Sequence, residues 1–204
     1  MLYSTELANR IETSDINSKF IEAGIQENVK FISAKADKSP NGNRFIAFKF
    51  EKDGKELSHT EWETSLRPNE TEESCQERGS KQVKRIMQIM QCFYKKEELI
   101  FTGSSFEEFT SWVADMMNVV NKDTLLRVKI VYNDKGYTTL PNYCKFTFIE
   151  PMVLPEGETS KIRIINEIDR LVRPVLADKE SVEKNPLEEI TSTNDDKISS
   201  DLPF

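Results

Sequence analysis

Two turn sequences, Asn41-Gly42 and Asp53-Gly54, constrain the fold more than any other feature of the chain. Asn-Gly and Asp-Gly supply the positive φ angles that tight β-hairpins require. Apolar and polar residues alternate around these turns, in residues 28–36, 44–50 and 56–63, as they do in half-buried strands. The sequence therefore predicts a meander of three strands.

Two helices are predicted after the meander, at residues 80–94 and 105–120. The second begins with Ser105 and Glu108, which can form a capping box. We interpret the apolar stripes of both helices as core contacts. The stripe of the first helix consists of Val83, Ile86, Met87, Met90 and Phe93. We interpret a polar stripe on the same helix as a solvated face, and it consists of Lys81, Lys84, Arg85 and Gln88.

Strands are predicted again at residues 125–132 and 143–149, on either side of a turn at residues 133–137. Residues 161–173 fit either a strand or a helix. Three strands, two helices and two further strands is the order of an OB-fold, a five-stranded Greek-key barrel with helices between strands three and four. An SH3-like barrel and a ferredoxin-like α+β sheet are alternatives that the pattern leaves open.

The length of 204 residues fits one domain with extensions. We expect a polar N-terminal extension at residues 1–22, the folded domain at residues 23–177, and a disordered acidic tail at residues 178–204. The tail holds eight acidic residues and three lysines, so it carries −5 of the net charge of −7. The remaining body is close to neutral, which is compatible with a nucleic-acid partner if its cations are clustered.

Several classes of protein do not fit this composition. The chain has no run of about 18 apolar residues and no apolar block near its N-terminus. Its three cysteines are widely spaced, which indicates neither a disulfide framework nor a zinc ribbon. We therefore expect a cytoplasmic protein without a cofactor.

The outward positions of the predicted strands combine cations with aromatic rings. OB-folds bind single strands through cations that follow the phosphates and rings on which bases stack. Residues 24–52 hold six cations against three acids, and residues 125–149 hold four against one. The predicted nucleic-acid-binding residues are Lys30, Lys35, Arg44, Phe45, Lys49, Trp62, Arg127, Lys129, Tyr137, Tyr143 and Lys145. Trp62 fits a cap over the barrel end equally well, and Lys or Arg at such positions is also common on any half-exposed sheet.

An enzyme would need a constellation of catalytic residues. The sole histidine, His59, lies close to Glu61 and Glu63, which resembles part of an acid–base or metal site. The sequence contains no Gly-rich phosphate loop, no nucleophile elbow and no Cys/His set with metal spacing. We therefore predict a structural histidine and a protein that is not an enzyme.

The C-terminal tip ends the acidic tail with an apolar group and a free carboxylate. Its predicted partner-binding residues are Asp195, Asp196, Asp201, Leu202, Pro203 and Phe204. The tip resembles that of bacterial and phage single-stranded-DNA-binding proteins, which reads roughly Asp-Asp-x-Pro-Phe. Here Leu202 stands between Asp201 and Pro203, and Lys197 interrupts the acidic run, so the tip departs from that pattern.

The body of the chain also resembles phage-encoded single-stranded-DNA-binding proteins. The similar segments are residues 20–29, 41–43, 57–63, 131–137 and 149–151, in that order. The resemblance implies an OB-fold that coats single-stranded DNA during replication and recombination, and a tip that recruits partner enzymes of those processes. For a phage-encoded protein, the expected location is the host cytoplasm. An RNA-binding OB module and an adaptor that binds only proteins are the alternatives, because a stacking groove does not by itself distinguish DNA from RNA.

Overall fold

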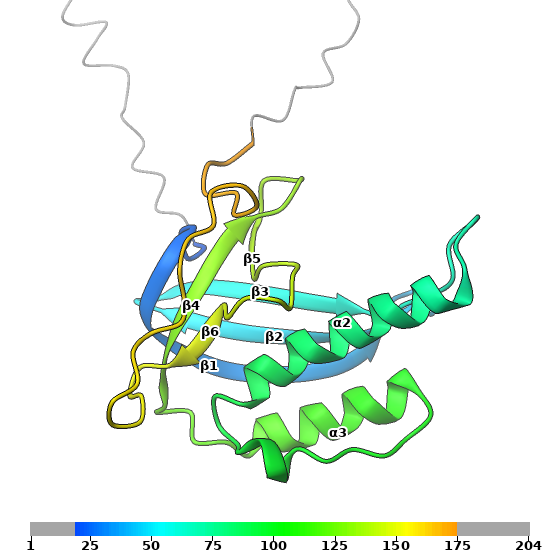
Figure 1. The fold of residues 1–204 in the computed structure, drawn as a ribbon, viewed down its shortest axis with the longest axis horizontal. Helices are drawn as coiled ribbons and strands as arrows, with labels where there is room; N and C mark the ends of the chain where they lie inside the picture. The colour runs from blue at the N-terminus through cyan, green and yellow to red at the C-terminus, as the bar shows by residue number, and fades with distance from the viewer. Residues whose placement is uncertain (1–18, 175–204) are drawn as a thin grey trace, which may run out of the picture. The chain divides into compact units, whose positions relative to one another are not determined.

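The structure, a computed structural model, describes residues 19–174. These residues form six strands, two α-helices and one short 3-10 helix (Figure 1). In chain order the elements are β1 (Gly24–Lys38), β2 (Arg44–Lys52), β3 (Lys55–Trp62), α2 (Glu72–Met90), η1 (Lys96–Glu98), α3 (Phe106–Asn118), β4 (Leu125–Tyr132), β5 (Thr138–Thr139) and β6 (Ile149–Pro151).

The six strands form one antiparallel sheet in the order β3-β2-β1-β4-β5, with β6 paired to β4. Asp53 and Gly54 have φ angles of 53° and 76°, as the turn between β2 and β3 requires. The predicted three-stranded meander is therefore confirmed. The long strand β1 pairs with β2 over one part and with β4 over another, and its register shifts at two bulges. These bulges bend β1 between the two pairings.

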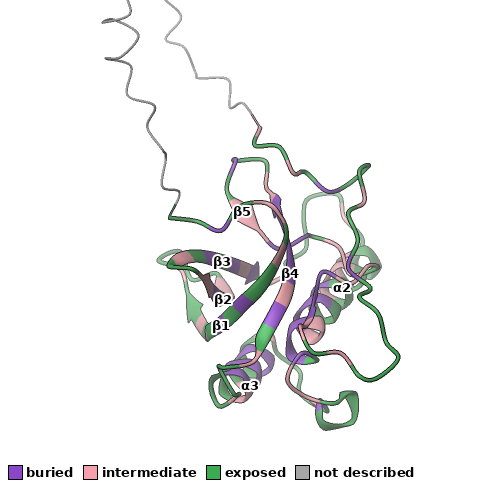
Figure 2. Cartoon of the chain, turned by 90° about the vertical axis from the view of Figure 1, so that its left-hand side faces the viewer, coloured by how far each residue is buried: buried purple, intermediate pink, exposed green. Residues whose placement is uncertain are grey.

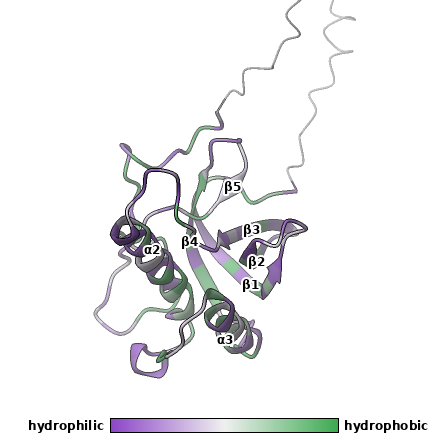
Figure 3. Cartoon of the chain, turned by 90° about the vertical axis from the view of Figure 1, so that its right-hand side faces the viewer, coloured by the Kyte–Doolittle hydropathy of each residue, from purple (hydrophilic) through white to green (hydrophobic). Residues whose placement is uncertain are grey.

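Both predicted helices are present between β3 and β4. The capping box at the start of α3 is confirmed, because Ser105 accepts from the backbone of Glu108 and Glu108 accepts from the backbone of Ser105. Helix α2 begins eight residues earlier than predicted, because Thr71 caps it and acidic residues follow in its first turn. Much of α2 is hydrophilic (Figure 3), and the predicted core residue Val83 is 39% exposed.

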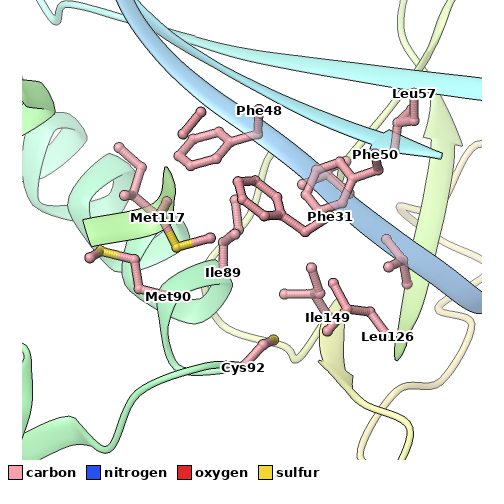
Figure 4. Close-up of a cluster of buried hydrophobic side chains, with 14 of the residues drawn as sticks. Phe31, Phe48, Phe50, Leu57, Ile89, Met90, Cys92, Met117, Leu126 and Ile149 are labelled. Atoms are coloured by element: carbon pink, nitrogen blue, oxygen red, sulfur yellow. The ribbon is translucent and has the colours of Figure 1, made fainter. Parts of the chain in front are cut away.

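The core lies between the inner face of the sheet and the two helices. Phe31, Phe48 and Phe50 project from β1 and β2 toward Ile89 of α2 and neighbouring side chains of both helices (Figure 4). Figure 2 shows how buried and exposed positions alternate along β1. The helices therefore cover one face of the β1–β3 sheet, and the alternate side chains point away from this core.

The second half of the domain departs from the prediction. Residues 143–148 contain no strand, and only Ile149–Pro151 pairs with β4. Residues 161–173 are neither strand nor helix, although Ile162 and Asp169 are buried. At the start, Ile21 is buried and donates to the carbonyl of Glu56, so the folded body begins before residue 23.

The fold class is mostly β, with a six-stranded antiparallel sheet and two helices rather than the predicted five strands. No described backbone ladder joins β3 to β5, the two ends of the sheet. A side-chain contact spans this gap, where His59 Nδ1 lies 2.9 Å from Thr139 Oγ1. Within residues 19–174, no helix is both long and apolar enough to cross a membrane. The predicted tail and most of the N-terminal extension lie outside the described residues.

Candidate nucleic-acid interface

The face of the β1–β3 sheet that points away from the core is set by strand register. Antiparallel partners share a face, so each row across the three strands has a known composition. One row holds Asp37, Phe45 and Trp62. The following rows are Lys35, Ala47 and Thr60, then Ser33, Lys49 and Ser58, and then Lys30, Glu51 and Glu56. We call these twelve residues the outer sheet face.

Two aromatic rings lie together at one end of the outer sheet face. The ring centroids of Phe45 and Trp62 are 4.8 Å apart, with an angle of 49° between the planes. Trp62 is 48% exposed, and Phe45 is half-buried. About half of the surface of Trp62 is open to solvent, so its ring is accessible as a platform on which a base can stack.

The cations of the outer sheet face differ in their availability. Lys30 and Lys49 are exposed, and within residues 19–174 neither forms an ion pair. Lys35 is paired with Asp37 at the surface. The face holds three lysines and three acids, so it is close to neutral. Binding at this face would therefore rely on ring stacking together with a few phosphate contacts.

Arg44 and Arg127 are both held by pairs of carboxylates. Arg44 Nε lies 3.0 Å from Glu107 Oε2, and its Nη1 lies 3.2 Å from Glu63 Oε2. The bond to Glu63 raises the pKa of Arg44. Arg127 contacts Glu150 at 2.8 Å and Glu27 at 3.1 Å. These four contacts make both arginines less available to phosphates than Lys30 and Lys49.

The prediction that Lys129 is an exposed cation is wrong. Its side chain is completely buried, and its Nζ donates to Asp169 Oδ2 at 2.8 Å and to the carbonyl of Arg163 at 2.6 Å. The cause is the segment at residues 161–170, which lies over this position of β4. That segment contains residues that the sequence left unassigned between strand and helix.

Tyr143 is half-buried and bonds to the same buried carboxylate as Lys129. Its hydroxyl donates to Asp169 Oδ1 at 2.8 Å, and burial followed by this hydrogen bond raises the pKa of Tyr143. No strand forms at Tyr143, so its predicted place at a strand edge is wrong. Lys145 is exposed, but its Nζ lies over the ring of Phe146, in a segment that is not a strand. Tyr137 is 59% exposed in the turn between β4 and β5.

A cleft of about 590 Å³ adjoins the outer sheet face at β3. Its walls come from the end of β3, from α2 and from the segment around β5, and Trp62 lies on its lining. Arg67, Arg78 and Lys81 bring positive charge to it, while Asn133 and Asn142 bring amides. We call it the β3–α2 cleft. The outer sheet face and this cleft share Thr60 and Trp62, so they form one continuous surface.

The inner wall of the β3–α2 cleft contains a buried polar network around Glu61. Arg85 donates to both carboxylate oxygens at 2.6 and 2.7 Å, and Gln82 donates to Oε2 at 3.1 Å. His59 Nε2 lies 3.2 Å from Oε1. Burial alone would raise the pKa of Glu61, but the bonds from Arg85 and His59 lower it to about 2. His59 is thus held between Glu61 and Thr139.

Arg67 and Arg78 were missed by sequence reasoning, and Lys81 and Arg85 were assigned to a solvated helix face. Arg85 is buried, so that assignment is wrong for it. Arg78 is bonded to Glu70 and Lys81 to Glu77, whereas Arg67 forms no ion pair with any described residue. No periodicity marks these residues, because the loop at residues 63–71 and α2 meet β3 only in the tertiary structure. No group of acidic, His and Cys residues within 19–174 is arranged to hold a metal.

Comparisons with protein-family models, with curated proteins and with solved structures yield no match to the chain. Of the predicted binding residues, the structure brings Lys30, Lys35, Phe45, Lys49 and Trp62 onto one face. The predicted partner-binding residues at 195–204 lie outside the described part of the chain.

Proposed function

We propose that this protein is a non-enzymatic single-stranded-DNA-binding protein of a phage, built on an OB-fold. It coats unpaired DNA with little sequence preference during replication and recombination. Residues 195–204 recruit a replication or recombination enzyme through the acidic tip. The OB-fold assignment is supported by the pairing of β1 with both β2 and β4, by the helices between β3 and β4, and by the contact of β3 with β5 through His59.

One observation carries the proposal. The exposed Trp62 and the half-buried Phe45 form an aromatic pair on the sheet face that also holds Lys30 and Lys49, which form no ion pair within residues 19–174. This face continues into the β3–α2 cleft. Stacking contributes about 1–3 kcal/mol per base and tolerates any base, because every base has a π-face. A near-neutral face with exposed rings therefore favours binding that is dominated by stacking.

The salt dependence follows from the number of available cations. Lys30 and Lys49 on the outer sheet face and Arg67 at the cleft form no ion pair within the described chain. Each phosphate contacted by a single strand contributes about −0.7 to the slope of log affinity against log salt. Three such contacts give a slope of about −2.

The test is fluorescence anisotropy with labelled oligothymidine, the corresponding duplex and oligouridine, each across a salt series. We expect tight binding to oligothymidine, weak binding to the duplex, and a slope of log affinity against log salt of about −2. Equal binding to oligouridine would indicate an RNA-binding module. Absence of binding to all three at low salt would refute the proposal.

A variant pair locates the site. Replacing Phe45 and Trp62 together with Ala should weaken oligothymidine binding about tenfold or more, because the stacking platform is lost. The matched control is Ile100→Ala, which removes an apolar side chain that is 76% exposed outside this face. The control should bind like the wild type. Equal affinity of the double variant and the control would place the site elsewhere.

A further inference from the structure

Strand β3 has one edge paired with β2 and one free edge. The N–H of Glu63 donates to the carbonyl of Arg44, on the side of β3 that faces β2. Hydrogen-bonded pairs alternate along an antiparallel ladder, so the odd-numbered residues of β3 bond to β2 and the even-numbered residues point to the other side. At the free side, the N–H and C=O of Glu56 bond to Lys19 and Ile21. The backbone groups of Ser58, Thr60 and Trp62 therefore point to the same free side as those of Glu56.

Most of these groups have no partner among residues 19–174. Gln82 Nε2 donates to the carbonyl of Trp62 at 2.6 Å. Within residues 19–174, the N–H groups of Ser58, Thr60 and Trp62 donate no hydrogen bond, and the carbonyls of Ser58 and Thr60 accept none. An unpaired edge of this kind is a template for an added hydrogen-bonding partner. Since Thr60 and Trp62 line the β3–α2 cleft, the partner would lie in the cleft.

The lining of the cleft indicates which partner fits. An extended peptide would satisfy the backbone groups, but it has no specific use for the exposed indole of Trp62. A nucleotide uses each feature, because its base stacks on Trp62, its edge bonds to the backbone and its phosphate approaches Arg67 or Lys81. The cleft of about 590 Å³ also lies in the size range of small-molecule sites, roughly 300–1,000 Å³.

We infer that the backbone N–H and C=O of Thr60, on the free edge of β3, hydrogen-bond to the Watson–Crick edge of one unpaired base held in the β3–α2 cleft. This inference rests on the proposed function and assigns a subsite within it. Each of the four bases has a donor and an acceptor side by side on that edge. A backbone edge with both kinds of group accepts all of them, so it discriminates little between sequences.

The subsite instead distinguishes unpaired from paired nucleic acid. In a duplex the Watson–Crick edge is already bonded to the opposite base, so it has no donor or acceptor left for β3. Exclusion of duplex DNA thus follows from hydrogen-bond chemistry at Thr60, in addition to the shape of the β3–α2 cleft.

The test compares oligothymidine with an oligothymidine methylated at N3 of every base. Methylation removes the N3 donor and blocks the Watson–Crick edge, but it keeps the stacking surface and the phosphates. We expect binding about tenfold or more weaker for the methylated strand. Equal affinity for the two strands overturns the subsite and leaves the proposed function intact, whereas failure of both strands to bind overturns both.

A variant pair isolates the backbone group. Thr60→Pro removes an N–H that takes no part in the ladder with β2, and proline is tolerated at such edge positions. This variant should bind the two strands more nearly alike. Thr60→Val keeps the N–H and the β-branched shape, so it should discriminate as the wild type does. Unchanged discrimination in a folded Thr60→Pro variant would contradict the inference.

Hydrogen exchange provides a readout that needs no variant. In the full chain without DNA, the amides of Ser58, Thr60 and Trp62 should exchange rapidly. Oligothymidine should slow the exchange of the Thr60 amide, and the methylated strand should not. Protection that is already present without DNA would mean that another segment pairs with this edge, and it would overturn the inference.

Discussion

Lys129 and Lys49 were predicted from the same pattern, and the structure assigns them opposite surroundings. Replacing Lys129 with Met keeps most of the side-chain volume but leaves the carboxylate of Asp169 buried without its cation. Breaking a buried ion pair in this way costs about 3–5 kcal/mol of unfolding free energy. Lys49→Met removes an exposed cation without an ion pair in the described chain, so stability should change by less than about 0.5 kcal/mol.

The effects of the two variants on DNA binding should be the reverse of their effects on stability. Lys49→Met should reduce the magnitude of the salt slope by about 0.7, the contribution of one phosphate contact. Lys129→Met should leave the slope unchanged under conditions where the variant remains folded. Urea unfolding followed by circular dichroism measures the stabilities, and anisotropy titrations across a salt series measure the slopes.

A third variant separates loss of the ion pair from loss of packing. Asp169 also accepts from Tyr143 at 2.8 Å and from the backbone N–H of Ile165 at 2.7 Å. Combining Lys129→Met with Asp169→Asn keeps an acceptor there but removes the unpaired charge, so part of the stability should return. A cost below about 1 kcal/mol for Lys129→Met alone, or a changed salt slope, would refute the argument that Lys129 is a buried structural residue.

Three further predictions concern the network, the helix cap and the tail. The folded-state pKa of Glu61 is about 2, below its usual value of 4.5, so its ionisation stabilises the fold above about pH 4.5 and this contribution is lost as pH falls toward 2. Glu61→Gln should therefore flatten the acid limb of the stability curve relative to wild type, by up to about 1.4 kcal/mol per pH unit, and an unchanged limb would contradict the assigned pairing. Ser105→Ala should cost about 1 kcal/mol in urea unfolding because the capping bond of α3 is lost, and Ser111→Ala on the exposed side of α3 is the control that should change little. Deleting residues 195–204 should abolish capture of replication or recombination enzymes from the host cell and leave the affinity for DNA equal or higher, whereas a large loss of DNA affinity would refute the role given to the tip.

Local sequence predicted those elements whose signals lie within a few residues. Asp53-Gly54 determined the β2–β3 hairpin, and alternation in β2 placed Phe45 and Lys49 on the face opposite the core residues. Ser105 and Glu108 determined the start of α3 through a bond that spans three residues. In each case the interacting groups are near neighbours in the chain, so their pattern can be recognised without knowledge of distant contacts.

Other features were decided only by tertiary structure. Alternation in β4 places Lys129 away from the core, but it carries no information on the segment at residues 161–170 that covers it and supplies Asp169. Tyr143 was assigned to a strand that does not form, because only Ile149–Pro151 of that region pairs with β4. The β3–α2 cleft likewise requires Arg67 and α2 to meet the free edge of β3. The sequence by itself therefore determined which strand faces carry cations and rings. Whether a given side chain is exposed there depended on long-range packing, because burial is set by whatever segment lies over a face and not by the strand's own period.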